Sequence, residues 1–284
     1  MTTLSEMMAH IRNRFAVAGI EDPMAEARIL VGGLLGLSRT DFITRGEQHL
    51  DLADEARIHN AVGRRIGGEP PYRILGRRAF YGLEFGLSAD TLEPRPDTEV
   101  LVDLVLELIG DRRTEPLDIL DLGTGTGAIC LALLSELPMA RGTGVDIAEG
   151  ALATARENAA LNGLSERFTT VRSNWFEGVD RAYDLIVSNP PYIRSDVVPT
   201  LDREVREHDP LLALDGGEDG LVAYRAIAAA SCAHLKPDGL VAVETGFDQR
   251  VDVAQVFAAA GFEEVATRKD YADNDRAQVF RPIN

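Results

Sequence analysis

The tetrapeptide Asn189-Pro190-Pro191-Tyr192 brings together residue types that could hold a nitrogen atom of a substrate. It follows residues 183–188, whose apolar character predicts a buried strand. Neither proline has an N–H, and each proline biases the residue before it away from helix. The carbonyl groups of Asn189 and Pro190 can therefore face outward, beside the Asn189 side chain and the Tyr192 ring. A side-chain oxygen and a main-chain oxygen so close together suit an NH2 group, which has two hydrogens to donate.

Two interpretations of this tetrapeptide are open from its four residues alone. It could be a clamp for a substrate amide or exocyclic amine, or it could be a proline-rich turn with a packed tyrosine. The other motifs of the chain favour the clamp, because they predict a ligand site at the same place.

A glycine-rich turn joins a predicted strand over residues 118–122 to a predicted helix over residues 128–137. Glycines there tolerate positive φ and let the backbone approach a ligand closely. The turn consists of Gly123, Thr124, Gly125, Thr126 and Gly127. Asp146 ends the next predicted strand about 20 residues later, where an acidic side chain usually accepts hydrogen bonds from ribose hydroxyls. Together these residues indicate a nucleoside cofactor, either a dinucleotide or S-adenosylmethionine.

The spacing Gly-x-Gly-x-Gly departs from the Gly-x-Gly-x-x-Gly of dinucleotide sites, which weakens the dinucleotide interpretation. The alternative without a ligand is a tight packing turn with a solvated Asp146. Trp175 follows a third predicted strand, over residues 168–171, and would stack on adenine or cover it as a hydrophobic lid. Trp175 could instead only close the core. Since all these motifs follow strands, we expect them at the carboxyl edge of one sheet, where ligands bind.

Regions of different pattern follow one another along the chain. Residues 1–70 have helical apolar spacing and predict a small N-terminal helical bundle without cofactor motifs. Residues 71–92 predict a linker with a β-hairpin, and residues 93–284 alternate predicted strands and helices. This alternation predicts an α/β fold with a Rossmann-like, doubly wound, mostly parallel sheet.

Arg95 lies between Pro94 and Pro96, and the two prolines make this segment stiff and exposed. The arginine side chain could face a ligand, or it could pair with Asp97 or Glu99. We expect a structural or gating role for it.

Composition restricts the classes of function. The chain has 284 residues, an apolar fraction of 45% and a formal net charge of −17, which argues against broad contact with phosphate backbones. No apolar run approaches the length of a membrane span, and the first residues lack the pattern of a signal peptide. Cys130 and Cys232 fit free thiols in a reducing compartment, so we expect a cytoplasmic protein. No metal site is predicted, and the five histidines fall outside the motifs above.

The glycine turn, Asp146 and the tetrapeptide together resemble class I S-adenosylmethionine-dependent methyltransferases that act on amino groups. Further segments make nearly the whole chain similar to the protein-(glutamine-N5) methyltransferases of peptide chain release factors. These segments are residues 68–70, 94–99, 121–129, 211–220 and 270–276.

The resemblance implies S-adenosyl-L-methionine as the cofactor and S-adenosyl-L-homocysteine as the product. It implies that residues 123–127, Asp146, Trp175 and Asn189 bind this cofactor. The family usually has Asp immediately before the tryptophan, whereas this chain has Asn174. An asparagine oxygen can still accept a hydrogen bond from an adenine amine, but it does so without charge.

The resemblance also implies how the substrate is held. Asn189, Pro190, Pro191 and Tyr192 would grip the glutamine of the Gly-Gly-Gln motif of class I release factors. Among them, Asn189, Pro190 and Tyr192 would be the catalytic residues. The N-terminal bundle would bind the protein substrate.

Four other functions remain open at this point. The same chemistry could serve another protein glutamine, such as one of a ribosomal protein, or an exocyclic amine of a flipped nucleic-acid base. A nucleic-acid enzyme needs a basic groove or a target-reading domain, which the acidic composition does not favour. A non-catalytic adenosine sensor or a Rossmann-type oxidoreductase would not need the tetrapeptide.

Overall fold

The structure is a computed structural model that describes residues 2–283. The chain divides into two compact units, Met1–Arg77 and Arg78–Asn284. None of the helices within the described residues combines the length and apolar character that a bilayer-spanning helix requires.

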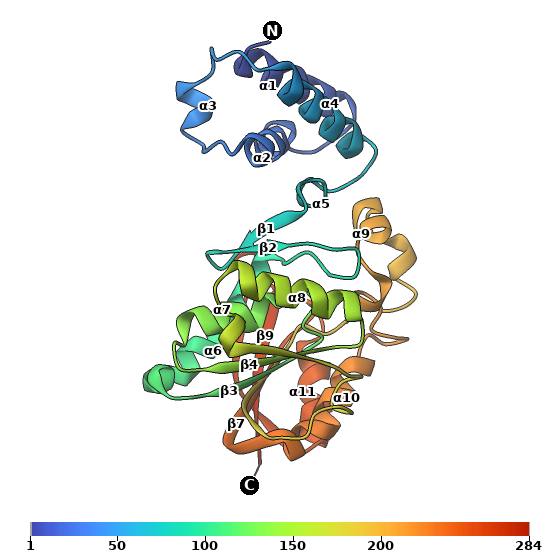
Figure 1. The fold of residues 1–284 in the computed structure, drawn as a ribbon. Helices are drawn as coiled ribbons and strands as arrows, with labels where there is room; N and C mark the ends of the chain where they lie inside the picture. Colours follow the sequence, from blue (N-terminus) through green and yellow to red (C-terminus); the bar gives the residue numbers. More distant parts are fainter. Residues whose placement is uncertain (1, 284) are drawn as a thin grey trace. The chain divides into compact units, whose positions relative to one another are not determined.

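The first unit is a helical bundle around its own apolar core (Figure 1). Its helices are α1 Leu4–Val17, α2 Pro23–Leu35, α3 Asp41–Thr44, α4 Leu52–Ile66 and α5 Pro71–Leu75. Local sequence explains where the long helices begin. Thr3 and Glu6 form a capping box, and Asp51 accepts a hydrogen bond of 2.7 Å from the Asp54 amide. The core side chains include Met7, Ile11 and Phe15 of α1, which repeat at helical spacing.

The second unit contains a seven-stranded sheet in the order β5-β4-β3-β6-β7-β9-β8. Its strands are β3 Asp118–Leu122, β4 Arg141–Asp146, β5 Phe168–Arg172, β6 Tyr183–Ser188, β7 Leu235–Glu244, β8 Phe262–Lys269 and β9 Asp275–Pro282. The first five strands in that order are parallel, and β9 runs antiparallel to both β7 and β8. The predicted doubly wound, mostly parallel sheet is therefore confirmed.

Helices cover both faces of this sheet (Figure 1). They are α6 Glu99–Ile109, α7 Ala128–Glu136, α8 Glu149–Leu161, α10 Val222–Ser231 and α11 Arg250–Ala259. The unit also contains the short helix α9 Arg203–His208, which has no buried residue. Ile119 of β3 packs in one apolar cluster with residues of α6 and α7, whereas its neighbour Leu120 packs in another with residues of α10 and α11. Successive strand residues point to opposite faces, so each of these buried strands contributes to two cores.

The strand order places a ligand site between β3 and β6. The chain runs outward from β3 through β4 to β5, and then returns to β6 on the other side of β3. In open α/β sheets the crevice at such a switch point binds ligands. Leu122 pairs with Ser188, and Ser188 pairs with Val243, so β3, β6 and β7 end side by side.

The region expected as a linker, residues 71–92, contains α5 and a hairpin formed by β1 Arg77–Phe80 and β2 Leu83–Gly86. The side chain of Asn158 in α8 bonds β2 at both the N–H and the C=O of Gly86, at 2.7 and 3.1 Å. These bonds fix β2 to the second unit.

Candidate active site

A cavity of about 540 Å³ lies within the second unit, at the carboxyl ends of β3, β4 and β6. The lining includes predicted site residues from every motif: Gly123, Thr124, Gly125, Thr126, Asp146, Trp175, Asn189 and Pro191. The structure therefore brings the glycine turn, the acid, the tryptophan and the tetrapeptide to one place. A volume of this size suits a drug-sized ligand.

The glycines of the turn divide into two roles. Gly123 and Gly125 have φ values of 69° and 53°, in the left-handed region that favours glycine. A Cβ atom at Gly123 would meet no heavy atom within 4 Å, and one at Gly125 would meet only the Gly123 oxygen at 4.0 Å. A Cβ atom at Gly127 would instead lie 3.1 Å from Leu131 and 3.4 Å from Ala155. Gly127 therefore serves close helix packing, whereas the first two glycines leave space beside the backbone.

A buried acid that the sequence analysis did not single out accepts a hydrogen bond from the glycine turn. The hydroxyl of Thr124 donates a hydrogen bond of 2.7 Å to Asp121 Oδ2, and Asp121 is only 1% exposed. Burial raises the pKa of Asp121 to about 7, although the hydrogen bond from Thr124 acts in the opposite direction. An acid within an otherwise apolar strand end, two residues before the first glycine of the turn, was the available signal.

Asp146 is fixed by main-chain amides at the end of β4. Its Oδ2 accepts a hydrogen bond of 3.0 Å from the Gly125 N–H, and its Oδ1 accepts one of 3.0 Å from the Ala148 N–H. Burial raises the pKa of Asp146, and these amide bonds oppose that shift. The carboxylate lines the cavity with its orientation set, as a group that binds ribose hydroxyls requires.

Trp175 both lines the cavity and packs against the apolar cluster beneath α10 and α11. Its φ of 50° is unusual for a bulky residue, so the surrounding structure must compensate for local strain. The neighbouring Asn174 donates a hydrogen bond of 2.9 Å from Nδ2 to Glu177 Oε1. Asn174 lines the cavity, and because its Nδ2 is engaged with Glu177, its oxygen is the side-chain atom that could accept from an adenine amine.

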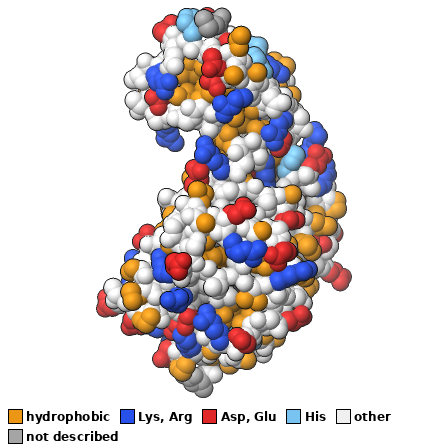
Figure 2. All heavy atoms as spheres, in the orientation of Figure 1, with side chains coloured by type: hydrophobic (Ala, Val, Ile, Leu, Met, Phe, Trp, Pro, Cys, Tyr) orange, Lys and Arg blue, Asp and Glu red, His pale blue; other side chains and the backbone are white. Residues whose placement is uncertain are grey.

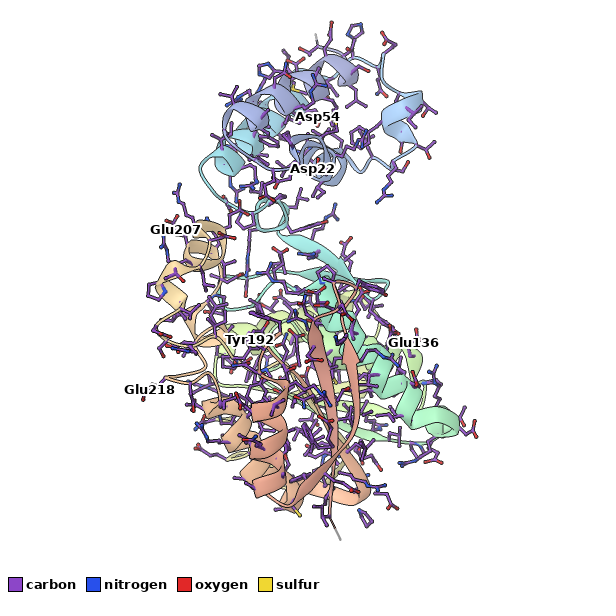
Figure 3. All side chains as sticks on the ribbon, turned by 180° about the vertical axis from the view of Figure 1, so that it is seen from behind. Asp22, Asp54, Glu136, Tyr192, Glu207 and Glu218 are labelled. Atoms are coloured by element: carbon purple, nitrogen blue, oxygen red, sulfur yellow. The ribbon has the colours of Figure 1, made fainter. Side chains whose placement is uncertain are left out.

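Within the tetrapeptide, Asn189 and Pro191 line the cavity. The Asn189 Nδ2 group donates a long hydrogen bond of 3.4 Å to Thr98 Oγ1. Pro190 is buried. Among the described residues that line the cavity, neither Pro190 nor Tyr192 is found. The Tyr192 hydroxyl donates to Glu244 Oε1 at 3.4 Å, and Gln249 donates to the Tyr192 carbonyl at 2.9 Å. Figure 3 shows Tyr192 in the interior of the second unit.

Glu244, at the end of β7, is a further acid that the sequence analysis missed. It is 2% exposed, and its Oε2 accepts a hydrogen bond of 2.6 Å from the Thr98 hydroxyl. Burial raises the pKa of Glu244 to about 7, while Thr98 and the Arg276 guanidinium, 3.9 Å from Oε1, lower it. Its position at a strand end, like that of Asp146, could have pointed to it.

Arg95 lines the cavity. Its Nη2 atom lies 2.6 Å from Asp209 Oδ2, so its ion pair is with Asp209 rather than with Asp97 or Glu99, the two partners that the sequence left open. Glu99 instead accepts a hydrogen bond of 2.8 Å from the Tyr81 amide. The ion pair joins two segments of the cavity wall, because Pro210 next to Asp209 also lines the cavity.

Comparisons with known proteins find relatives of both units of the chain. Family models match a PrmC N-terminal domain over residues 6–76 and a methyltransferase small domain over residues 98–232. The release factor glutamine methyltransferase of Agrobacterium fabrum is 53% identical, over 98% of this chain and 97% of its own length. That of Caulobacter vibrioides is 42% identical, over 96% of this chain and 94% of its own length.

A solved methyltransferase structure from Pyrococcus furiosus covers 80% of this chain and 97% of its own, with a TM-score of 0.53 and 17% identity, and shares its fold. The relatives of higher identity span both units, and the resemblance inferred from the sequence motifs is confirmed. The chain belongs to the release factor glutamine methyltransferase family.

Proposed function

We propose that this protein transfers a methyl group from S-adenosylmethionine to the side-chain amide nitrogen, N5, of a glutamine in a class I peptide chain release factor. The glutamine is that of the Gly-Gly-Gln motif. The sulfonium C–S bond breaks as the N–C bond forms, and S-adenosylhomocysteine and a proton released from the amide nitrogen are the other products. One observation carries the proposal: the Asn189 amino group is turned toward Thr98, which leaves the Asn189 oxygen as an acceptor in a cavity that the glycine turn also lines.

The residues around the cavity fit the cofactor. Gly123 and Gly125 leave room for a ligand against the backbone, and Asp146 presents a fixed carboxylate for ribose hydroxyls. Trp175 and the Asn174 oxygen supply an apolar ring and an acceptor for adenine. When bound, S-adenosylmethionine supplies a methyl group already activated on a sulfonium.

The protein must compensate for a weak nucleophile. An amide nitrogen reacts poorly because its lone pair is delocalised into the carbonyl group. Hydrogen bonds from its two hydrogens to the Asn189 side-chain oxygen and the Pro190 carbonyl would orient the nitrogen. They would also stabilise the positive charge that develops on nitrogen during attack. Pro191, which lines the cavity, would restrict the glutamine, and Tyr192, whose hydroxyl donates to Glu244, would hold the tetrapeptide in place.

The charge distribution favours a protein substrate over a nucleic acid. The chain has a net charge of −17, and on the face shown in Figure 2 the Lys and Arg side chains are interspersed with Asp and Glu. Binding of DNA or RNA, double- or single-stranded, would require a continuous basic surface. A glutamine of another protein, such as a ribosomal protein, is the alternative substrate that differs least in chemistry.

The proposal also covers how the release factor is bound and in which compartment the reaction occurs. The N-terminal helical bundle has its own core and matches a PrmC N-terminal domain, which supports a role in binding the release factor. Because release factors are translation proteins, the proposed reaction takes place in the cytoplasm.

The test is incubation of the protein with labelled S-adenosylmethionine and purified release factor, followed by mass-spectrometric mapping of the modified residue. One methyl group on the Gly-Gly-Gln glutamine is expected. A release factor with that glutamine replaced by alanine is the control and should take up no label. Label on another residue, or on a ribosomal protein only, would exclude the proposed substrate.

A further inference from the structure

The register of the sheet brings a buried carboxylate next to the tetrapeptide. Ser188 of β6 pairs with Val243 of β7, so the residues that follow them, Asn189 and Glu244, lie at the same level at the carboxyl edge of the sheet. Asn189 lines the cavity, whereas Glu244 is 2% exposed. The two side chains are connected through a single residue, Thr98.

Thr98 has one hydroxyl hydrogen, and the structure shows where it goes. Thr98 donates to Glu244 Oε2 at 2.6 Å, which is short for an O–H···O bond and typical of an ionised acceptor. The hydroxyl oxygen can then only accept from Asn189, whose Nδ2 lies 3.4 Å away. An Asn189 side chain turned by 180° would place its oxygen against the Thr98 oxygen, with no hydrogen between them. The carboxylate of Glu244 thus determines which end of the Asn189 carboxamide faces the cavity.

The same carboxylate reaches the other end of the tetrapeptide. Glu244 Oε1 accepts from the Tyr192 hydroxyl at 3.4 Å, and Arg276 Nη1 lies 3.9 Å from that oxygen. A buried charge of this kind costs desolvation energy and is weak evidence for stability by itself. Its direct contact with Tyr192 and its connection to Asn189 through Thr98 indicate a role in orienting the tetrapeptide.

We propose that Glu244 is a positioning residue which, through the Thr98 hydroxyl, keeps the Asn189 side-chain oxygen directed at the amide nitrogen to be methylated. This inference rests on the proposed function, because it assigns a role in that reaction. Neither Glu244 nor Thr98 takes part in proton transfer: the carboxylate fixes the direction of the hydrogen bonds.

The test compares two substitutions of Thr98, one that keeps the size of the side chain and one that keeps its hydroxyl. Thr98→Val removes the hydrogen bond without a large change in volume, and Thr98→Ser retains the hydroxyl. We expect Thr98→Val to lower kcat roughly 10- to 100-fold, because the acceptor oxygen is no longer held in line. Thr98→Ser should restore kcat to within about threefold of the wild type, since its hydroxyl can remake both bonds. The dissociation constant for S-adenosylmethionine, measured by titration, should stay within about threefold in both variants.

A second measurement is independent of catalysis. In protein labelled with ¹⁵N-asparagine, the Asn189 side-chain signals can be assigned by their loss in Asn189→Ala. They should shift in Thr98→Val and in Glu244→Gln, and should stay near the wild-type position in Thr98→Ser. This readout would hold even if the substrate were a different protein, so it separates failure of the inference from failure of the proposed function.

Two outcomes would overturn the inference. One is equal kcat in Thr98→Val and Thr98→Ser with unshifted Asn189 signals. The other is loss of cofactor binding and of thermal stability in both Thr98 variants, which would show that Thr98 only fills space.

Discussion

The Asn158 side chain donates a hydrogen bond of 2.9 Å from Nδ2 to the main-chain oxygen of Thr126, in the glycine turn. Asn158 also bonds the N–H and C=O of Gly86 in β2, and it is 2% exposed. One buried carboxamide in α8 therefore links the turn that lines the cavity to the hairpin.

Replacing this asparagine should disturb the turn. Asn158→Ala removes the side-chain partner of three main-chain groups, of which the Thr126 oxygen is buried and the two of Gly86 are partly buried. A buried group left without a partner costs about 1–3 kcal/mol. We expect a lower melting temperature and an increase of roughly tenfold in the dissociation constant for S-adenosylmethionine, corresponding to about 1.4 kcal/mol. Calorimetric titration of the purified variant measures both the affinity and the stoichiometry of binding.

Asn162→Ala provides the matched control for this prediction. Asn162 also joins α8 to the hairpin, with a hydrogen bond of 2.8 Å from Nδ2 to the Glu84 oxygen, but no described bond connects it to the glycine turn. Its removal should lower stability modestly and leave cofactor affinity nearly unchanged. Equal losses of affinity in the two variants would mean that the hairpin, rather than the bond to Thr126, supports the site.

Local features of the fold could be predicted from the sequence, whereas the support of the site could not. The caps at Thr3 and Asp51 involve residues three positions apart, and the glycine turn is contiguous. Thr98 and Glu244 are 146 positions apart, and Arg95 and Asp209 are 114 apart. Those contacts depend on strand order and register, which periodicity does not specify. Most of the predicted site residues line the cavity, whereas the buried acids Asp121 and Glu244 were not predicted.

Removal of the Asn189 side chain should separate binding from chemistry. In Asn189→Ala the substrate nitrogen loses its side-chain acceptor, while the glycine turn and Asp146 remain in place. We expect kcat to fall by about 10²- to 10³-fold, as for loss of one preorganised hydrogen-bonding group in other enzymes. Binding of S-adenosylmethionine, followed by titration, should be largely intact. Retained turnover would remove the Asn189 oxygen from the mechanism.

The ion pair between Arg95 and Asp209 predicts a gating effect. Arg95 is partly exposed, with 38% of its side chain accessible, whereas the side chain of Asp209 is 5% accessible. Arg95→Met retains the stem and removes the charge, so the two wall segments should separate more often. We expect the cofactor dissociation rate in stopped-flow measurements to rise roughly two- to fivefold, since partly exposed pairs contribute little.

Arg203→Met is the control for that experiment. Arg203 pairs with Glu207 at 2.8 Å on α9, and both side chains are exposed. Loss of this surface pair should not change the dissociation rate of the cofactor. An Arg95 variant that behaved like the Arg203 variant would argue against a gate.

The surroundings of Glu244 predict how methyl transfer depends on pH. Asp97 raises the pKa of Glu244 in addition to burial, and Arg276 and Thr98 lower it, with about 7 as the result. Tyr192 donates to its carboxylate, and Tyr224 of α10 donates to its main-chain oxygen at 2.9 Å. Below this pKa, Glu244 is protonated and can donate a hydrogen bond to the Thr98 oxygen. The Thr98 hydroxyl can then donate its own hydrogen to the Asn189 oxygen, which is no longer available to the substrate.

We therefore expect kcat to rise with pH between 6 and 8, with an apparent pKa of about 7. Glu244→Gln removes the titrating group, so its kcat, although lower, should be nearly independent of pH over this range. The measurement is initial rate at saturating cofactor and release factor across the pH series. If kcat of Glu244→Gln still rises with pH as in the wild type, the titration belongs to another group.

The stability of the protein should change in the opposite direction over an overlapping range of pH. The pKa of Glu244 in the folded protein, about 7, lies above its ordinary value of 4.5, so the folded state binds the proton more tightly than the unfolded chain does. The contribution of Glu244 to stability is thus fully present below about pH 4.5 and is lost as the pH rises through 7. Glu244→Gln should consequently gain stability relative to the wild type between pH 5 and pH 8, as urea unfolding at the two pH values would measure. If the difference in free energy of unfolding between the two proteins does not change with pH, Glu244 ionises at the same pH in the folded and unfolded states. The rise of kcat with pH would then need another origin.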